Sequence, residues 1–222
     1  DFAGYSGMAF GLAKMLGVEL MQNFRAPYLA RDMGDFWRRW HITLSYWIRD
    51  YLYLPLGGSR RGELRNAFNL IVIFFVCGLW HGAGWNFILW GLFHGVAVQT
   101  HRALRSWWSF LPNLVQTVIT FHVVCLGWLL FRADGVGQAW GMFLSLFDNF
   151  GPLDQNFVNT LANVALYVSL PLLHQAWEAR FGTPVLLLHL SWPLRHAFGL
   201  ILVMLVFYFG SFGERSFIYF QF

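Results

Sequence analysis

His81 is an ionisable side chain in the middle of a long uncharged stretch of the chain. It lies in the sequence GLWHGAGWNFILWGLFHG, residues 78–95, and residues 66–100 contain no Asp, Glu, Lys or Arg. Ionisable groups at membrane depth are costly, so one that faces a bundle interior is a candidate functional group. Burial disfavours the charged imidazolium, and we therefore expect a neutral ring that can accept a proton. Such a base could deprotonate a sugar or glycerol hydroxyl as it attacks a thioester; a structural histidine is the alternative.

Three glycines, Gly78, Gly82 and Gly84, surround His81. Repeated glycine lets backbones approach closely or lets a helix break around a cavity, so a regular lipid-exposed helix is not expected here. No serine or cysteine stands beside His81 in a nucleophile motif. This favours direct transfer through a base over a covalent acyl-enzyme.

A second histidine, His41, lies in a predicted amphipathic helix over residues 36–54. Asp32 is the expected N-cap of this segment, and Asp35 follows three residues later, as in a capping box. A helix with tryptophan on one face and arginine on the other suits the bilayer interface, either in plane or dipping at an angle. His41 then points inward, as a site residue or as a structural histidine. The apolar face, with residues at helical spacing, consists of Trp37, Trp40, His41, Leu44, Trp47, Ile48 and Tyr51.

The elements that must position these histidines are membrane helices. The chain is 57% hydrophobic and 12% charged, which lies outside the balance of soluble folds. Apolar stretches of about 20 residues can cross a bilayer, and only helices satisfy their own backbone there. Residues 66–100 are long enough for two crossings or a broken, re-entrant helix pair. The sequence thus predicts an all-α, polytopic membrane protein with a single domain over residues 1–222, and further apolar stretches lie at residues 2–20, 114–131, 157–177 and 196–212.

Charge and cysteine usage restrict the partners. Eight of the fifteen basic residues fall in residues 25–65, which predicts a cytoplasmic location for that segment and favours anionic lipid headgroups or an anionic acyl donor over nucleic acid. The turn at residues 55–62 could hold an anionic group on its backbone amides, although a solvated loop is the simpler interpretation. Cys77 and Cys125 show no disulfide or zinc spacing, and the scattered histidines predict no metal site.

Two stretches carry a family resemblance. DFWRRWHITLSYWIRDYLYLPLGG, residues 35–58, and GLWHGAGWNFILWGLFHG closely resemble the membrane-bound O-acyltransferase (MBOAT) family, and within it the bacterial alginate O-acetyltransferase branch. Supporting matches are DFAGYSGMAFGLAKMLG near the start, NFRAPYLAR at residues 23–31 and SFIYFQF at residues 216–222. Members of that branch are about twice as long, so the chain resembles a C-terminal half whose earlier crossings are missing.

The resemblance implies roles for particular residues. The histidine of the family's WHG motif corresponds to His81, and the histidine of its RWH stretch corresponds to His41. The implied fold is a helical bundle around a central funnel, with in-plane or re-entrant helices. The donor would approach from the cytoplasm and the acceptor from the opposite side. Trp37, Arg38, Trp40 and Trp80 are further candidates for lining the site, by proximity and helical facing.

The sequence therefore predicts a membrane O-acyltransferase of a bacterial inner membrane. It would pass an acetyl group from a cytoplasmic thioester, acetyl-CoA or an acyl carrier, toward an exported polysaccharide, with no bound cofactor. An extracytoplasmic acetyltransferase or polysaccharide-synthesis proteins would be its partners. The alternatives are a D-alanyl transferase of teichoic acid synthesis, a transporter or flippase in which His81 relays protons, and a non-catalytic scaffold.

Overall fold

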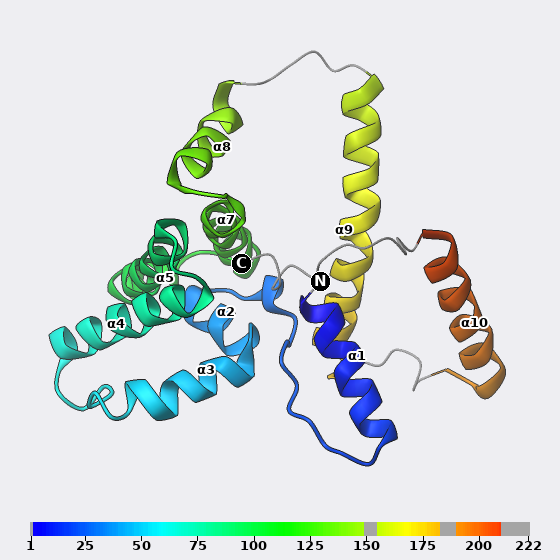
Figure 1. Ribbon diagram of the computed structural model, residues 1–222, viewed down its shortest axis with the longest axis horizontal. Helices are drawn as coiled ribbons and strands as arrows, with labels where there is room; N and C mark the ends of the chain where they lie inside the picture. Colours follow the sequence, from blue (N-terminus) through cyan, green and yellow to red (C-terminus); the bar gives the residue numbers. More distant parts are fainter. Residues whose placement is uncertain (1, 149–154, 183–189, 210–222) are drawn as a thin grey trace.

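The computed structural model describes residues 2–148, 155–182 and 190–209, and every regular element in these ranges is a helix (Figure 1). This confirms the all-α prediction. The α-helices are α1 (Phe2–Met15), α2 (Met33–Arg39), α3 (Ile42–Ile48), α4 (Glu63–His81), α5 (Trp85–Ala103), α6 (Arg105–Trp108), α7 (Asn113–Arg132), α8 (Val136–Asp148), α9 (Gln155–Phe181) and α10 (Trp192–Phe209). A short 3₁₀ turn, η1 (Pro27–Leu29), precedes α2, and a π-helical turn, η2 (Arg49–Tyr53), follows α3.

The helix pair expected in residues 66–100 is a hairpin of α4 and α5. Glycine makes the close packing of the two helices possible, because a Cβ on Gly78 would overlap the carbonyl oxygen of Phe87 and a Cβ on Gly91 would overlap that of Phe74. The connection is three residues long, and its two glycines, Gly82 and Gly84, flank Ala83. The hairpin is therefore held together by close contact between the helix backbones.

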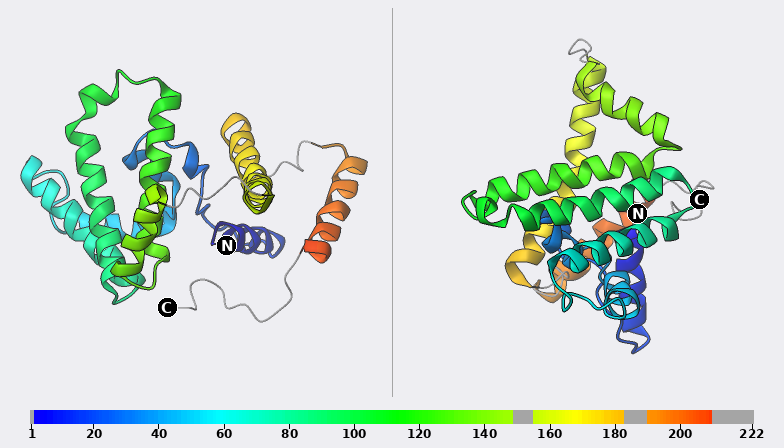
Figure 2. Two further views of the ribbon diagram at one scale, coloured as in Figure 1. Left: turned by 90° about the horizontal axis from the view of Figure 1, so that it is seen from above. Right: turned by 90° about the vertical axis from the view of Figure 1, so that its left-hand side faces the viewer.

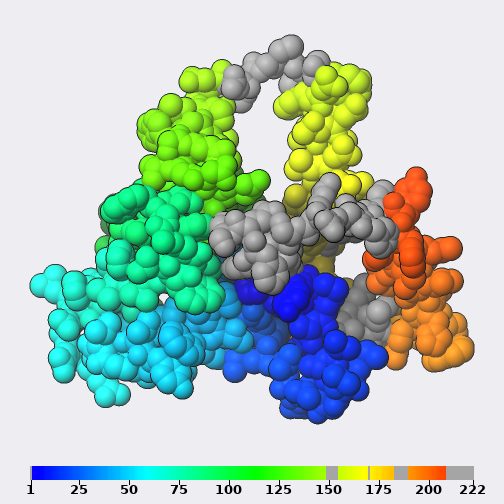
Figure 3. All heavy atoms as spheres, in the orientation of Figure 1, coloured from blue at the N-terminus to red at the C-terminus, as the bar shows by residue number. Residues whose placement is uncertain are grey.

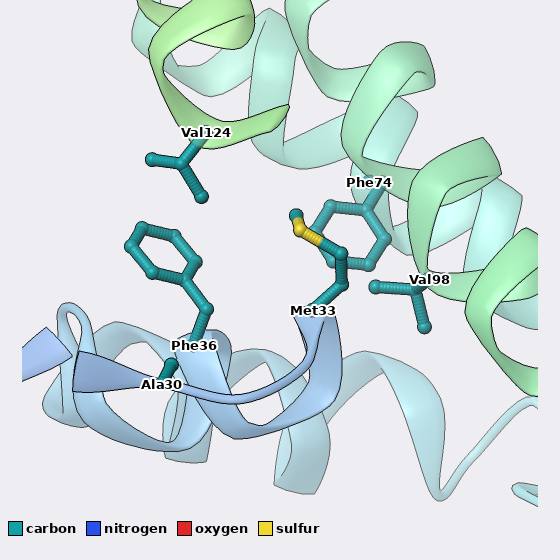
Figure 4. Close-up of a cluster of buried hydrophobic side chains, with 6 residues drawn as sticks. All are labelled: Ala30, Met33, Phe36, Phe74, Val98 and Val124. Atoms are coloured by element: carbon teal, nitrogen blue, oxygen red, sulfur yellow. The ribbon is translucent and has the colours of Figure 1, made fainter. Parts of the chain in front are cut away.

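The hydrophobic core forms where α2 and α7 pack against this hairpin. Figure 4 shows side chains from the segment before α2, from α2 and from α4, α5 and α7 converging on one cluster. Phe36 of α2 is 1% exposed and Val124 of α7 is completely buried. This core fixes the position of the segment that leads from α2 to His41. Its buried members are Ala30, Met33, Phe36, Phe74, Val98 and Val124.

The remaining helices lie outside this core. Figure 2 shows α1 and α9 between the hairpin side of the molecule and α10, and in Figure 3 α8 and α9 form two separate projections at the top of the view. α9 reaches the core side through its C-terminal part, which packs against η1. The described residues of α1 include no buried side chain.

Within the described ranges, three helices are long and apolar enough to cross a membrane: α4, α7 and α9. They lie at three of the predicted crossing stretches. The return helix α5 has 19 residues, but it contains no continuous stretch apolar enough to count as a candidate span. The predicted crossing at residues 196–212 corresponds in part to the shorter apolar helix α10, while residues 210–212 and the stretch 216–222 lie outside the described residues.

One predicted element is wrong. Residues 36–54 do not form a continuous helix, because α2 ends at Arg39 and α3 begins at Ile42. The N-cap was correctly predicted, although α2 begins at Met33 rather than at residue 36: the Asp32 side chain accepts a hydrogen bond from the Asp35 amide at 2.7 Å. Asp35 in turn accepts one from the Arg31 amide at 3.3 Å, so the two carboxylates cap the start of α2 together.

Candidate functional site

His81 is the last residue of α4, directly before the glycine connection to α5. Its side chain is half-buried, and its ring packs edge-on against three aromatic rings. The centroid distances are 4.8 Å to Trp80, 5.1 Å to Trp90 of α5 and 5.1 Å to Phe131 of α7. The helix end that the glycines predict therefore places the His81 imidazole where α4, α5 and α7 meet.

His41 lies at the break between α2 and α3. Its backbone is in the left-handed region, with φ 45° and ψ 54°, which is uncommon for a residue with a side chain and persists only where the surroundings impose it. The amide of the next residue, Ile42, donates to the carbonyl of Asn23 at 3.0 Å, and the Trp40 amide closes α2 on the carbonyl of Phe36 at 2.8 Å. These two hydrogen bonds end α2 and stabilise the break, even though the apolar periodicity of the sequence continues through it.

The two histidines contact a common side chain. The ring of Trp80 lies 4.8 Å from that of His81 and 6.3 Å from that of His41, both in edge-to-face arrangement. The structure thus brings together two residues that are 40 positions apart in the sequence.

The imidazole of His41 is neutral at neutral pH. Burial lowers its pKa from 6.5 to about 4. The side chains packed on the ring are Asn23, Phe2 and Trp80, none of which carries a charge. His41 can therefore accept a hydrogen bond or a proton with one of its ring nitrogens.

A cleft of about 430 Å³ opens beside His41. His41 and Trp80 form one side of it together with two small polar groups, Asn23 and Thr43. The other walls are largely apolar and come from α1 and the segment that follows it. The lining residues are Phe2, Tyr5, Ser6, Ala9, Phe10, Leu20, Met21, Asn23, His41, Thr43 and Trp80.

The four secondary candidates fall in different places. Trp80 lines the cleft, whereas Trp37 lines a separate cavity of about 240 Å³ between α3 and α4. Trp40 packs against the hydrophobic core and contacts Trp128 with a centroid distance of 4.9 Å. The side chain of Arg38 is 69% exposed and pairs with Asp35 at 3.6 Å. The structure therefore places only Trp80 beside both histidines, and any catalytic role of these residues stays a prediction.

Asn23 and Thr43 were missed from the sequence. The Asn23 side-chain oxygen lies 3.2 Å from Nδ1 of His41, and it accepts from the amide and the hydroxyl of Thr43 at 3.2 and 2.9 Å. An asparagine 18 residues away from a histidine has no spacing that reveals such a contact. The available signal was its position at the start of NFRAPYLAR, one of the stretches that carry the family resemblance.

His94 was grouped with the scattered histidines, yet it is the most buried of them in the described ranges. Its side chain is 0% exposed, and neither ring nitrogen has a hydrogen-bond partner. It packs against Trp37 and Trp90 with centroid distances of 5.2 and 4.9 Å, and α7 approaches it closely at Gly127. Its aromatic surroundings make it part of the packing beneath the site.

The turn at residues 55–62 is tied to α4. The buried side chain of Asn69 donates to the carbonyl oxygens of Leu56 and Gly58 at 3.2 and 3.1 Å. Arg60 and Arg61 are exposed beside it. The anion-binding role considered for this turn stays a prediction.

Comparison with known proteins gives one family and several relatives. Residues 1–131 match the model of the membrane-bound O-acyltransferase family. The chain is 41% identical over 185 residues to a probable alginate O-acetylase of Azotobacter vinelandii, covering 82% of this chain and 36% of that protein. It is 47% identical over 143 residues to a peptidoglycan O-acetyltransferase of Helicobacter pylori, covering 63% of this chain and 27% of that protein.

A teichoic acid D-alanyltransferase of Bacillus subtilis is 32% identical over 146 residues, covering 59% of this chain and 37% of that protein. The chain spans about a third of the length of these curated relatives. His41, His81 and Asn23 all lie within the residues that match the family model.

Proposed function

The chain belongs to the membrane-bound O-acyltransferase family, and we propose that it forms the reactive part of an acetyltransferase acting on an exported polysaccharide. The observation that carries the proposal is the meeting of His41 and His81 around Trp80, next to the cleft of about 430 Å³. A pair of imidazoles at such a site suits proton transfer from a hydroxyl group.

In the proposed reaction His81 is the general base. It removes the proton of the acceptor hydroxyl as the hydroxyl oxygen forms a bond to the acetyl carbonyl carbon. The carbon–sulfur bond of the thioester then breaks, and the proton passes from His81 to the departing thiolate. The result is an oxygen ester and a free thiol, so protons and electron pairs balance without a redox partner.

A direct transfer agrees with the state of one thiol on α4 and one hydroxyl on α3. Cys77 lies one helical turn before His81, but it is 4% exposed. The hydroxyl of Ser45 donates to the carbonyl oxygens of Trp37 and Trp40 at 3.2 and 3.5 Å, so its proton is already used within the backbone of α2. Neither group is presented as a nucleophile, which supports attack by the acceptor hydroxyl itself.

The donor in this proposal is a cytoplasmic thioester, acetyl-CoA or an acyl carrier. The protein would cross a bacterial inner membrane several times, and the three candidate spans together with the family support this location. The acceptor would be the polysaccharide itself or an extracytoplasmic acetyltransferase that completes the relay. Polysaccharide-synthesis proteins would be its partners.

Two other acceptors follow from the relatives. The Helicobacter pylori relative is a peptidoglycan O-acetyltransferase, which makes peptidoglycan a candidate acceptor for the same acetyl chemistry. Transfer of D-alanine to teichoic acid has weaker support, because that relative is 32% identical over a smaller share of the chain. A transporter in which His81 relays protons is the candidate from another class.

The test is a His81→Ala variant of the protein in cells whose exported polymers are analysed for ester-linked acetyl groups. We expect acetylation to fall by at least the 10²–10⁴-fold that general bases typically supply, with normal amounts of protein in the membrane. A matched His122→Ala variant, at an exposed histidine of α7, should acetylate normally.

A second measurement separates transfer from transport. Proteoliposomes that hold the protein are supplied with an acetyl thioester, and the release of free thiol is followed together with acetyl ester formation on added polysaccharide. Release of thiol that depends on both His81 and the polymer supports the transferase. Normal acetylation by the His81→Ala variant would contradict the base role, and movement of polymer without thioester cleavage would favour the transporter.

A further inference from the structure

The side-chain amide of Asn23 joins three groups of the α2–α3 segment. Its oxygen Oδ1 lies 3.2 Å from Nδ1 of His41, 3.2 Å from the backbone nitrogen of Thr43 and 2.9 Å from the Thr43 hydroxyl. Its nitrogen Nδ2 faces the hydroxyl of Ser6 on α1 at 3.4 Å. Asn23 thus contacts both the break that carries His41 and a wall of the cleft.

The backbone of Thr43 determines which way this amide is turned. A backbone N–H can only donate, so the Asn23 atom that faces the Thr43 nitrogen must be the acceptor oxygen. The same oxygen faces Nδ1 of His41, and an oxygen without a hydrogen requires a donor there. Nδ1 of His41 must therefore carry the proton. In a neutral ring the lone pair is then on Nε2, which hydrogen-bonds to no described residue.

The main chain holds the two residues in register. The carbonyl of Asn23 accepts from the Ile42 amide at 3.0 Å, and the Arg25 amide donates to the carbonyl of Arg39 at 2.9 Å. These bonds connect the segment after α1 to both sides of the break, where His41 keeps its left-handed backbone. Asn23 therefore restrains both the ring of His41 and its strained backbone.

We propose that Asn23 is a positioning residue that fixes His41 in the Nδ1–H tautomer, so that the Nε2 lone pair accepts a hydrogen bond from a hydroxyl of the acceptor next to the attacking one. This inference rests on the proposed transferase function of the site. It also changes the role expected for His41: with its one N–H bound to Asn23, the neutral ring has no N–H left to donate to the thioester carbonyl. By holding the neighbouring hydroxyl, His41 orients the acceptor so that the attacking hydroxyl can give its proton to His81.

The first test measures the tautomer without any reaction. The protein is labelled with ¹⁵N-histidine in detergent micelles, and the ring nitrogens of His41 are identified by their loss in a His41→Gln variant. We expect a protonated Nδ1 and an unprotonated Nε2 in the wild-type protein at neutral pH. In an Asn23→Leu variant, which has a similar volume but no acceptor, the Nε2–H form should appear. A wild-type ring protonated at Nε2 overturns the proposal.

The second test uses kinetics of acetyl transfer in proteoliposomes. Asn23→Leu should lower kcat by about 10–100-fold, by analogy with the loss found when the hydrogen-bond partner of a metal-ligating histidine is removed, with little change in KM for the thioester. Asn159→Leu, at an exposed asparagine on α9, should leave kcat unchanged. Full activity of Asn23→Leu contradicts the proposal.

An Asn23→Asp variant provides the conservative rescue. Its carboxylate still accepts from Nδ1–H, but its negative charge raises the pKa of His41, so that activity at pH 8 should return while the acid limb of the pH–rate profile moves to higher pH. The other ionisable groups near the ring in the described chain are Tyr5 in the cleft and His81 beside Trp80. If the Asn23→Asp variant is as inactive as Asn23→Leu at every pH, the proposal is contradicted.

The two proposals fail separately. If the tautomer is as expected but no variant or wild-type protein releases thiol from a thioester, the transferase function fails while the hydrogen-bond assignment stands. If the wild-type protein transfers acetyl groups and the Asn23→Leu variant transfers them at the same rate, only the positioning role of Asn23 is wrong.

Discussion

Gly91 of α5 lies so close to α4 that a Cβ on it would come within 3.2 Å of the Cα of Gly78. Together with Gly95, one turn later on α5, it forms a surface of small residues against which α4 packs. The rings of His81 on α4 and Trp90 on α5 lie 5.1 Å apart. They can contact each other because the two helices pack this closely.

A Gly91→Ala substitution should therefore separate the hairpin. Its methyl group would overlap the backbone of Phe74, and overpacking of this kind typically costs about 1–3 kcal/mol. We expect a lower unfolding temperature in detergent and reduced acetyl transfer. The control is Gly141→Ala on α8, where a Cβ meets no atom within 4 Å, so the unfolding temperature should not fall. Equal stability of the two variants would contradict the close packing.

Trp80 should contribute to transfer through its contacts with both histidines. Aromatic pairs are worth about 0.5–1.5 kcal/mol beyond their buried area, so Trp80→Ala should reduce kcat/KM by about 2–12-fold. Trp85→Ala is the matched control, because Trp85 is 72% exposed and Trp80 60%, and Trp85 lines no described cavity. The measurement is acetyl transfer in proteoliposomes at a low thioester concentration. An equal effect of the two substitutions would indicate a general loss of apolar surface.

The burial of His41 predicts a pH dependence of stability. Its pKa is about 4 in the folded chain and about 6.5 when unfolded, so the unfolded state binds the proton first as the pH falls. The stability associated with the neutral ring is fully present above pH 6.5 and is lost between about pH 6.5 and 4. Thermal unfolding in detergent at pH 7.5 and 5 should show a smaller difference for His41→Gln than for the wild-type protein. An unchanged difference would mean that His41 does not titrate in this window.

Glu178 of α9 should support the segment that carries Asn23. It is 8% exposed and accepts hydrogen bonds from the Ala26 amide at 2.9 Å and from the side chain of Gln22. Ala26 has a left-handed backbone, with φ 45°. Removing the carboxylate leaves buried donors without a partner, at a cost of about 1–3 kcal/mol. Glu178→Ala should therefore lower the unfolding temperature and slow acetyl transfer.

The loosened segment can be detected directly. Trypsin should cleave after the exposed Arg25 faster in Glu178→Ala than in the wild-type protein, and mass spectrometry of the fragments identifies the site. Glu178→Gln keeps an acceptor oxygen for the Ala26 amide and should be milder. Glu19→Ala, at an exposed glutamate of the same segment, serves as the control. Unchanged cleavage in Glu178→Ala would show that α9 does not restrain this part of the chain.

The sequence predicted the features that depend on local chemistry. The glycines around His81 indicated a helix end, and α4 ends at that residue. Asp32 was identified as a helix cap, and its side chain accepts the expected amide. The uncharged stretch was long enough for a helix pair, and the hairpin of α4 and α5 fills it.

The sequence could not predict the features that depend on distant partners. The apolar periodicity continues through His41, so the local sequence does not indicate the break between α2 and α3. The hydrogen bond from the Ile42 amide to the Asn23 carbonyl helps to impose this break. Glu178 and Ala26 are 152 residues apart, and no pattern connects a carboxylate on one helix with an amide in an irregular segment. The burial of His94 likewise depends on the packing of α5 against α2 and α7, which the sequence of α5 alone does not contain.

The hydrogen bonds between α9 and the segment before α2 have a consequence for biogenesis. Ribosomes release a chain from its N-terminus, so residues 22–28 leave the exit tunnel long before Gln175 and Glu178 are made. During that interval the amides of Ala26 and Tyr28 lack the acceptors that they have in the folded protein. The segment that carries Asn23 therefore gains these acceptors only after α9 has been made, and a nascent chain inserted up to α7 would hold this segment less firmly.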